Sequence, residues 1–280
     1  MTEMATPDQP VVVGVDGSES SGKAAFWAAA EASRRNAALQ LVIVNDDPAR
    51  VDYAEQAVHK IAAKCRVQTP EVELTAEVAP GHPVEELLRR SATAQLVVLG
   101  ARGHGGFTDA LLGGVSTGVA THASCPVVIV RKDIPTTVGP VVVGVDDSPC
   151  SQEALRFAFA AAARLGTDLV VMQAWHEEGL LAVPLTPPDR ERVQRDIEHS
   201  LAKQTASLRE QNPKVRTREV AQRGHPVAAL TDAARDARLL VVGHRGGGGF
   251  DGLFLGSVAA GVLHHAPCPV AVVRAAAGAS

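Results

Sequence analysis

The sequence predicts an α/β protein built from two tandem, Rossmann-like open sheets, each mostly parallel, five-stranded and covered by helices on both faces. Three observations predict this fold: the chain repeats itself, short apolar runs alternate with helical patterns, and aromatic residues make up only 3% of 280 residues although 46% are hydrophobic. A core made mainly of Val, Leu, Ile and Ala suits parallel strands that are buried on both faces. Because the repeats are alike and closely linked, we expect a pseudo-two-fold axis between them.

An internal repeat defines the domain organisation. The string PVVVGVD begins at Pro10 and again at Pro140. A second block, GHPV, begins at Gly81 and again at Gly224. The chain is therefore one domain written twice, with expected domains at residues 1–133 and 134–280.

The segments between the repeats and within the second copy are expected to be loops. Residues 131–140 form the linker. The two copies of GHPV are farther apart than the two copies of PVVVGVD, so the second copy carries an insertion after its second strand. The stretch at residues 176–190 contains Pro184, Pro187 and Pro188, and such a density of proline is typical of a loop. We expect the insertion to lie there.

Five pairs of apolar runs are expected to be strands. Most are near-continuous runs of β-branched residues or Leu without polar alternation, which indicates burial on both faces. The expected strands are residues 11–15, 39–44, 72–78, 96–99 and 127–130 in the first copy, and 141–145, 169–173, 215–220, 239–242 and 270–273 in the second.

Helical patterns separate these strands. In the first copy they cover about residues 23–35, 52–64, 83–94 and 116–123. Pro83 and Pro226 stand where the first turn of a helix tolerates proline. A charged stretch at residues 189–210 is expected to be a helix with an inward face formed by Val193, Ile197, Leu201 and Leu208. Strand-helix alternation favours open, mostly parallel sheets with right-handed crossovers.

Composition narrows the class of protein. The formal charge is −4, from 27 basic and 31 acidic residues, so the overall balance does not indicate binding to nucleic acid or to an anionic membrane. No apolar run approaches the length that spans a bilayer, and the N-terminus lacks the features of a signal peptide. The four cysteines are too sparse for a disulfide framework. We therefore expect a cytoplasmic protein.

Glycines and one carboxylate follow two strands of each copy. Gly14 and Asp16 follow the first strand, and the second copy repeats them as Gly144 and Asp146. A glycine-rich stretch follows the fourth strand of each copy. Ligands of open α/β sheets bind beyond the carboxyl ends of the strands, so these positions are the candidate site.

The glycine-rich stretch has the same spacing in both copies. Gly100, Gly103 and Gly113 correspond to Gly243, Gly246 and Gly256, and a helix is expected to begin directly after the last glycine. Glycine lets the backbone approach a phosphate, and a helix N-terminus offers N–H groups and a positive dipole end. A serine hydroxyl at Ser257 would add a donor.

The pattern G-x2-G-x9-G-[ST] after the fourth strand, with an Asp after the first, resembles the ATP-binding signature of the universal stress proteins. The resemblance covers essentially the whole chain. With two copies of the pattern, the chain is similar to the tandem members of that family. It implies that Asp146 lies near the nucleoside and Gly144 near the base or sugar, and that Ala174 presents its backbone to adenine. It also implies that the loop at residues 243–249, with Ser257 and Val258, holds the phosphates. The full candidate set is Gly14, Asp16, Gly100, Arg102, Gly103, Gly113, Gly114, Val115, Gly144, Asp146, Ala174, Gly243, Arg245, Gly246, Gly247, Gly256, Ser257 and Val258.

The first copy departs from this pattern. Gly114 stands where the family has Ser or Thr, and Asp46 is assigned to the position of Ala174. We expect weaker nucleotide binding by the first copy, unless Ser116 recovers the lost contact. Asp46 could accept a bond from the adenine amino group or could repel an anionic ligand.

Several other readings of these residues stay open. The glycines could serve only tight turns and close packing, and Asp16 and Asp146 could cap the following turn or helix, as could Ser18 and Ser148. Arg102, His104 and Arg245 could neutralise phosphate or could be solvated.

Three short motifs are rejected as sites. The stretch GSESSGKA at residues 17–24 fails as a P-loop because Ala24 has no hydroxyl for Mg²⁺. Gly247, Gly249 and Gly252 satisfy G-x-G-x-x-G but follow a fourth strand, where a dinucleotide fingerprint does not belong. His122 with Cys125, and His265 with Cys268, supply too few ligands for a zinc site.

The leading hypothesis is an ATP-binding stress-response regulator, with Mg²⁺ as a candidate companion ion, because neither copy offers a positioned base, nucleophile or metal set. We therefore do not expect an enzyme, although slow ATP hydrolysis stays open. The alternatives are a nucleotide-using enzyme on the same scaffold and a ligand-free interaction scaffold. The expected partners are ATP and an unidentified protein, with a homodimer compatible with the sequence, and neither nucleic acid nor membrane is expected.

Overall fold

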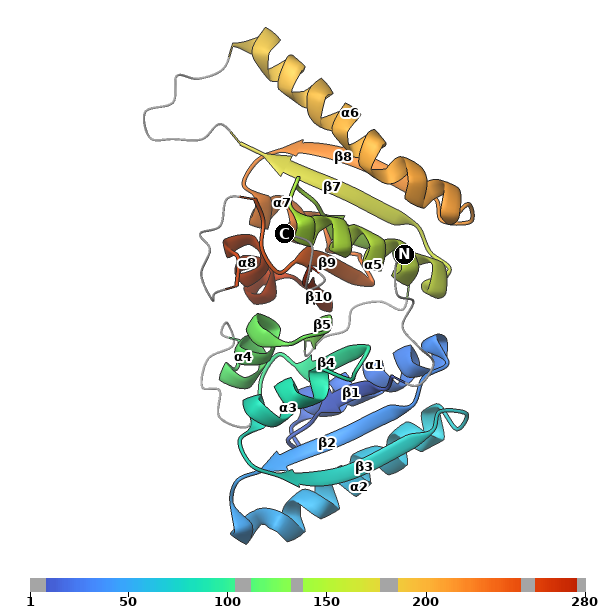
Figure 1. The fold of residues 1–280 in the computed structure, drawn as a ribbon, viewed down its shortest axis with the longest axis vertical. Coiled ribbons are helices and arrows are strands. Elements are labelled where there is room, and N and C mark those ends of the chain that lie inside the picture. The colour runs from blue at the N-terminus through green and yellow to red at the C-terminus, as the bar shows by residue number, and fades with distance from the viewer. Residues whose placement is uncertain (1–8, 104–111, 132–137, 177–185, 248–254, 276–280) are drawn as a thin grey trace. The chain divides into compact units, whose positions relative to one another are not determined.

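The computed structural model describes residues 9–103, 112–131, 138–176, 186–247 and 255–275. By contacts the chain divides into two units. The first holds residues 1–134, 253–255 and 269–272, and the second holds the rest. Figure 1 shows strand-helix alternation within each unit. The expected boundary at residues 133 and 134 lies outside the described residues, and the pseudo-two-fold axis stays a prediction.

The first repeat alternates strands and helices in the expected order. Its elements are β1 (Val11–Gly14), α1 (Glu19–Arg35), β2 (Leu39–Asn45), η1 (Pro48–Arg50), α2 (Val51–Gln68), β3 (Leu74–Pro80), α3 (Pro83–Ser91), β4 (Leu96–Gly100), α4 (Gly114–His122) and β5 (Val127–Val130). The second repeat has the same order, without the 3₁₀ turn among its described residues. Its elements are β6 (Val141–Gly144), α5 (Pro149–Leu165), β7 (Leu169–Trp175), α6 (Pro187–Gln211), β8 (Thr217–Arg223), α7 (Pro226–Ala233), β9 (Leu239–Gly243), α8 (Ser257–His265) and β10 (Val270–Val273).

Parallel pairing confirms the predicted sheet type. In the first unit the strand order is β3-β2-β1-β4-β5, with every one of these pairs parallel. In the second unit β8, β7, β6 and β9 are paired in the same way. The order reverses beside β1 and beside β6, so the carboxyl ends of β1 with β4, and of β6 with β9, form the switch point where such sheets bind ligands.

Apolar strands form the core, as their composition predicts. Every residue of β4 and β5 is buried, and β1 and β6 are buried up to their terminal glycines. The third strands, β3 and β8, lie at the sheet edges, and each begins two residues later than expected. Both expose polar residues, at Thr75 and Glu77 in β3 and at Arg218, Gln222 and Arg223 in β8. A strand with one solvated face needs polar residues on that face, which blurs the apolar run that marks its start.

The helix ends follow from local side chains. Ser18 and Ser148 cap α1 and α5 by accepting the N–H of the residue three positions on. Both helices then end in the left-handed conformation, at Asn36 with φ 51° and at Gly166 with φ 60°. Asn and Gly are the residues that adopt this conformation at least cost.

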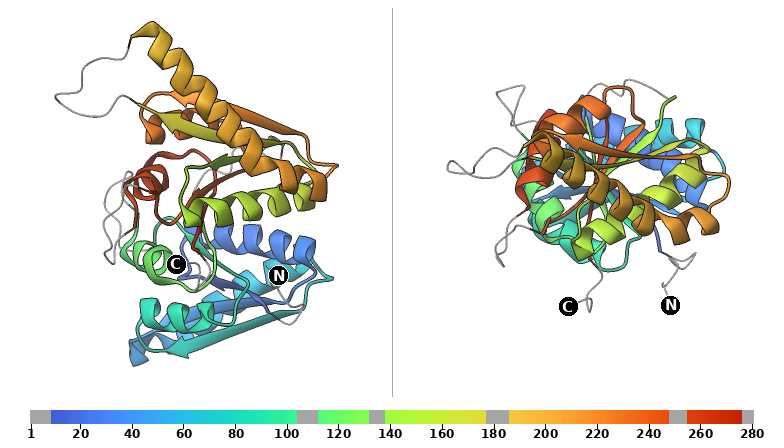
Figure 2. Two further views of the ribbon diagram at one scale, coloured as in Figure 1. Left: turned by 45° about the horizontal axis from the view of Figure 1, so that its top comes forward. Right: turned by 90° about the horizontal axis from the view of Figure 1, so that it is seen from above.

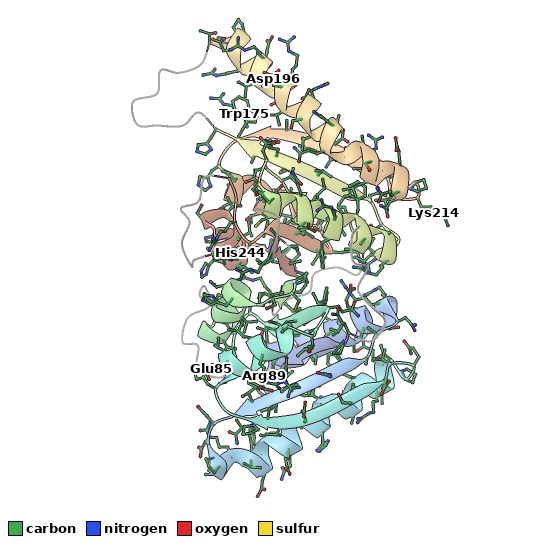
Figure 3. All side chains as sticks on the ribbon, viewed as in Figure 1. Glu85, Arg89, Trp175, Asp196, Lys214 and His244 are labelled. Atoms are coloured by element: carbon green, nitrogen blue, oxygen red, sulfur yellow. The ribbon has the colours of Figure 1, made fainter. Side chains whose placement is uncertain are left out.

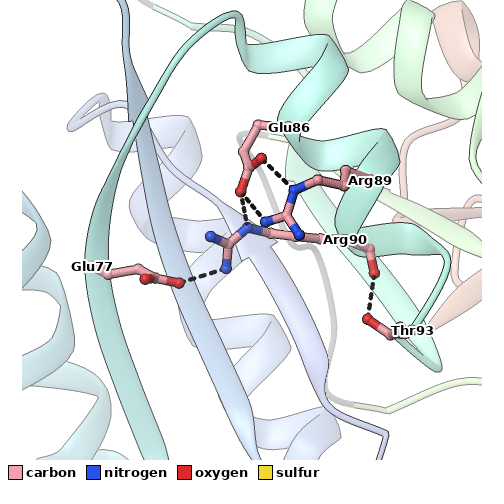
Figure 4. Close-up of polar contacts among 5 residues, drawn as sticks. All are labelled: Glu77, Glu86, Arg89, Arg90 and Thr93. Atoms are coloured by element: carbon pink, nitrogen blue, oxygen red, sulfur yellow. Dashed lines mark hydrogen bonds and ion pairs between the residues drawn. The ribbon is translucent and has the colours of Figure 1, made fainter.

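A charged cluster joins α3 to the edge strand β3 (Figure 4). Glu86 Oε1 accepts from Arg89 Nη2 at 2.6 Å and from Arg90 Nε at 2.7 Å, and Arg90 Nη1 reaches Glu77 Oε1 at 2.5 Å. The hydrogen bond from Arg89 is the largest reason that the pKa of Glu86 is lowered to about 2, with Arg90 adding to it and burial opposing it.

The insertion in the second repeat is shared between a loop and a helix, so placing it in the loop was partly wrong. The α6 helix has 25 residues against 18 in α2, so part of the insertion lengthens this helix, and the connection before it holds the rest. Pro187 and Pro188 are the first helical residues and not loop residues, because a helix start does not need their N–H groups. Figure 2 shows α6 lying along β7 and β8.

Strand β10 of the second repeat belongs by contacts to the first unit. It pairs with β5 in antiparallel fashion, with Val270 opposite Ile129 and Val272 opposite Val127. This pairing covers the edge of β5. Within the residues that the structure describes, no helix is both long and apolar enough to cross a bilayer.

Candidate functional site

The carboxylate after β6 is held by backbone amides at the carboxyl edge of the second sheet. Asp146 Oδ1 accepts the N–H of Ser148 at 2.9 Å, and Oδ2 accepts the N–H of Gly247 at 2.9 Å. The helix α5 is capped by Ser148 and not by Asp146. The reading of Asp146 as a helix cap is therefore wrong, whereas its reading as a turn cap is confirmed by the bond from Ser148 N–H. The carboxylate also joins the end of β6 to the glycine loop after β9.

Gly246 is adjacent to this carboxylate. A Cβ at Gly246 would lie 2.5 Å from Asp146 Oδ2, a separation that real Cβ atoms do not show. At Gly247, by contrast, a Cβ would meet nothing within 4 Å. The middle glycine of the pattern is thus required by Asp146, and the next glycine leaves an open surface.

A backbone hydrogen bond closes the glycine loop. Gly256 N donates to His244 O at 2.9 Å, and Gly113 N donates to Ala101 O at 2.9 Å in the first repeat. These bonds bring the start of α8 and of α4 beside the end of the fourth strand of each repeat. The first and last glycines of the pattern are therefore neighbours in space, although most of the loop between them lies outside the described residues.

The first turn of α8 points its amides at this place. Gly256 is the N-cap and has no side chain to accept the first-turn N–H groups, and Ser257 is exposed. The N–H groups of a first turn have no partner within the helix. Ser257 and Val258 therefore present backbone donors, and Ser257 adds a hydroxyl, beside Gly246 and Asp146.

The first repeat has the same frame without the hydroxyl. Ser18 N donates to Asp16 Oδ1 at 3.0 Å, and a Cβ at Gly103 would collide with Asp16 Oδ2. Gly114 begins α4, where its N–H and that of Val115 replace those of the second repeat. The site residues of each repeat are thus brought together as predicted, and the difference at the helix start is confirmed.

Four of the candidate glycines serve close packing. A Cβ at Gly14 or at Gly144 would lie 2.6 Å from Leu99 or 2.7 Å from Leu230, respectively. A Cβ at Gly100 would lie 2.8 Å from Ser20 Oγ, and one at Gly243 would lie 3.0 Å from the backbone of Cys150. Glycine therefore allows close packing at these strand ends.

Ala174, which was expected to follow the second strand of its repeat, lies inside that strand. Ala174 is the sixth residue of β7 and pairs with Gln222 of β8. Met172 O accepts the N–H of Val145 on the β6 side. Backbone groups alternate sides along a strand, so those of Ala174 point to the same side as those of Met172, beyond the place where β6 ends. That direction suits the proposed contact with a base.

Asp46 was assigned to the wrong position. Gly14 pairs with Val42 and Gly144 pairs with Met172, so the second strands of the two repeats correspond at the same spacing as the first strands. The counterpart of Ala174 is therefore Val44, and Asp46 corresponds to His176. The first repeat does not place a carboxylate at the position of Ala174.

Ser116 is not placed to replace the missing hydroxyl. It is 5% exposed, and its Oγ donates to Gly100 O at 2.7 Å, which joins α4 to the end of β4. Swinging this side chain toward a ligand would leave a buried carbonyl without its donor.

The P-loop-like stretch and the His–Cys pairs lie where the residues that the structure describes offer no phosphate or metal site. Gly22 and Lys23 lie inside α1, and Lys23 Nζ pairs with Glu19 at 3.0 Å, so no phosphate loop forms there. Cys125 is buried, and burial raises the pKa of its thiol to about 12, which opposes metal binding. In the described part of the chain, no three His, Cys, Asp or Glu side chains are grouped so as to hold a metal. His104, Gly249 and Gly252 lie outside the described residues.

Trp175 is a residue that the sequence reasoning missed. Figure 3 labels this residue. Its Nε1 donates to Gln194 Oε1 at 2.9 Å, and Gln194 Nε2 donates to Ala221 O at 2.9 Å. These bonds fix α6 to the ends of β7 and β8, next to Ala174. A tryptophan at a strand end, in a chain with two tryptophans, was the available signal.

Both repeats match one family profile. The universal stress protein family matches residues 9–131 and 137–274. The chain belongs to the universal stress protein family. It is similar to a universal stress protein of Mycobacterium tuberculosis, with 36% identity over 286 residues that cover 94% of this chain and 96% of that protein.

A solved structure that covers nearly the whole chain agrees with the tandem fold. A universal stress protein from Archaeoglobus fulgidus DSM 4304 superposes with a TM-score of 0.71 at 22% identity, covering 97% of this chain and 98% of that one. A universal stress protein solved in complex with cAMP is 27% identical, covers 46% of this chain and 100% of its own, and has a TM-score of 0.39.

Proposed function

We propose that the protein binds ATP, more tightly through its second repeat, and that nucleotide occupancy regulates a partner in a stress response. The observation that carries this proposal is the meeting of Asp146, the Gly246–Gly247 backbone and the start of α8 at the switch point of the second sheet. Glycine backbone and a free helix N-terminus are the elements that bind phosphate in α/β folds.

The donors of this site suit a phosphate more than a neutral ligand. Ser257 contributes a hydroxyl, and the first-turn amides of α8 carry the positive end of the helix dipole. Arg245 follows β9 directly after His244 and adds a positive charge. The backbone of Ala174, which points past the end of β6, supports an adenine as the base.

The groups at this site support a regulatory role more than a catalytic one. Among the described residues, the groups at the site are backbone amides, serine hydroxyls, arginines and a carboxylate whose two oxygens accept backbone N–H groups. A general base for hydrolysis must be poised to take a proton from water. We place this activity in the cytoplasm, where the four free cysteines would stay reduced.

The test is the nucleotide that accompanies the freshly purified protein. The intact chain is expected to release an adenine nucleotide on denaturation, identified by its mass, and a Gly246→Val variant is expected to release less. Calorimetry with added ATP should then give saturable binding. Protein that releases no nucleotide and gives no binding heat with ATP would instead favour a ligand-free interaction scaffold.

A further inference from the structure

An arginine directly follows the last strand of each repeat, at the edge of the sheet that carries the site. Arg131 follows β5, and Arg274 follows β10. The repeated blocks CPVVIVR and CPVAVVR both end in this residue. Neither arginine belongs to the glycine pattern.

A backbone hydrogen bond places Arg274 beside the glycine loop. His244 N donates to Val273 O at 2.7 Å, and Ala101 N donates to Val130 O at 2.8 Å in the first repeat. The chain therefore leaves β10 next to the residue that precedes Arg245. In both repeats this geometry puts the arginine that follows the last strand, Arg131 or Arg274, next to the start of the glycine-rich stretch.

The electrostatics agree with this placement. Burial lowers the pKa of Arg274, the nearby positive charge of Arg245 lowers it further, and Cys150 acts in the opposite direction. Two guanidinium groups brought together at a half-buried place repel each other, and an anion between them would offset that repulsion.

Among the described residues around the glycine loop, the arginines are the positively charged hydrogen-bond donors. Asp146 carries negative charge, but its Oδ1 and Oδ2 accept the N–H groups of Ser148 and Gly247. The backbone amides and Ser257 at α8 are neutral. Planar guanidinium groups bind phosphate oxygens in pairs, which suits a chain of phosphates more than a single one.

We propose that Arg274, together with Arg245, binds the outer phosphates of the nucleotide and makes the second repeat select nucleoside polyphosphates over monophosphates. This inference rests on the proposed function and names Arg274 as a specificity-determining residue of that site. Arg131 has the corresponding position in the first repeat.

The experiment compares Arg274→Gln with its parent in the intact chain, where Gly103→Val silences the first site. Calorimetry measures the affinities for ATP, AMP and inorganic tripolyphosphate. We expect Arg274→Gln to weaken ATP and tripolyphosphate about tenfold, the typical loss of one charged hydrogen-bonding group, and AMP less than twofold. Arg216→Gln is the control, because Arg216 is 85% exposed, pairs with Asp168 and precedes β8 at the opposite edge.

Arg274→Lys provides a second variant that keeps the positive charge and the apolar stem. Its preference for ATP over AMP should lie between those of Arg274→Gln and the parent. Equal losses for ATP and AMP, an unchanged ATP affinity in Arg274→Gln, or no recovery in Arg274→Lys would overturn the inference.

The tripolyphosphate arm separates this inference from the proposed function. If the parent binds neither ATP nor AMP, the proposed function is wrong. Tripolyphosphate binding that Arg274→Gln weakens would then still support an anion site at Arg274. Tripolyphosphate binding that the substitution leaves unchanged, or its absence in the parent, would overturn the arginine site as well.

Discussion

Gly246 leaves no room for a side chain because of Asp146. A Cβ at this glycine would lie 2.5 Å from Asp146 Oδ2, the oxygen that accepts the N–H of Gly247. The carboxylate thus requires the glycine even before a ligand is considered, and it holds the backbone that a phosphate would meet. One contact accounts for two residues that the family pattern links although they are far apart in the sequence.

Gly246→Val should abolish ATP binding by the second repeat. The new side chain would displace the Asp146 carboxylate and break its bond to Gly247, at a cost of about 1 to 3 kcal/mol in stability for an overpacked site. Calorimetry measures the binding, and urea unfolding measures the stability. Gly247→Ala is the matched stability control, since its Cβ would meet nothing within 4 Å. Unchanged ATP affinity in Gly246→Val would show that the site lies elsewhere.

Ser257→Ala should weaken ATP binding by on the order of 1 to 3 kcal/mol, the usual loss for a hydrogen bond to a charged group. The fold should be unaffected, because Ser257 is exposed at the start of α8. Titration of ATP into the variant and the parent measures this loss. Identical affinities would exclude the hydroxyl from the site.

Gly114→Ser should strengthen ATP binding by the first repeat. A Cβ at Gly114 meets nothing within 4 Å, so the serine fits and restores the hydroxyl that Ser257 supplies in the second repeat. We expect a gain of about tenfold in affinity, or roughly 1.5 kcal/mol. The measurement uses the intact chain with Gly246→Val, so that the first site alone is read. No gain would mean that the helix start does not contact phosphate.

Glu86→Gln should destabilise the first unit at neutral pH by about 1 kcal/mol, because it removes the charged partner of Arg89 and Arg90. The pKa of Glu86 is lowered from 4.5 to about 2, so its stabilisation is present above pH 4.5 and is lost as the pH falls toward 2. Thermal unfolding at pH 7 and at pH 3 should therefore show a smaller difference from the parent at pH 3. Glu55→Gln, on the exposed face of α2, is the control. A difference that does not change with pH would contradict the role of this charge.

Two helical glycines should respond to alanine in opposite directions. Gly22→Ala in α1 meets nothing within 4 Å and should stabilise the protein by about 0.5 to 1 kcal/mol through helix propensity. Gly261→Ala in α8 would bring a Cβ to 2.5 Å from Val227 Cγ2, whose branched side chain is stiff, and should destabilise it. Melting temperatures measure both effects, and shifts of the same sign would be inconsistent with this packing.

The regular elements and the site frame could be predicted from the sequence because each has a local cause. Buried strands appear as apolar runs, and Ser18 and Ser148 mark helix starts. Because the domain is repeated, each of these patterns occurs at two corresponding places in the sequence. The family resemblance implied that the loop at residues 243–249 and the start of the next helix share one site, and the His244–Gly256 bond shows how they come together.

The parts that could not be predicted depend on long-range geometry. The partner of Ser116 is the carbonyl of Gly100, and only the packing of α4 on β4 reveals it. Asp46 was misassigned because it follows a strand end, where the pairing register and not the residue type decides which positions of the two repeats correspond. The extension of α6 was hidden because Pro187 reads equally as loop or as helix start.

The central claim is that the two sites are unequal, and ATP titration of two variants of the intact chain tests it most directly. Gly103→Val leaves the second site, with Ser257, and Gly246→Val leaves the first site, with Gly114. The account predicts that the Gly103→Val protein binds ATP about tenfold more tightly, from the one hydroxyl that differs. Equal affinities, or tighter binding by the Gly246→Val protein, would contradict it.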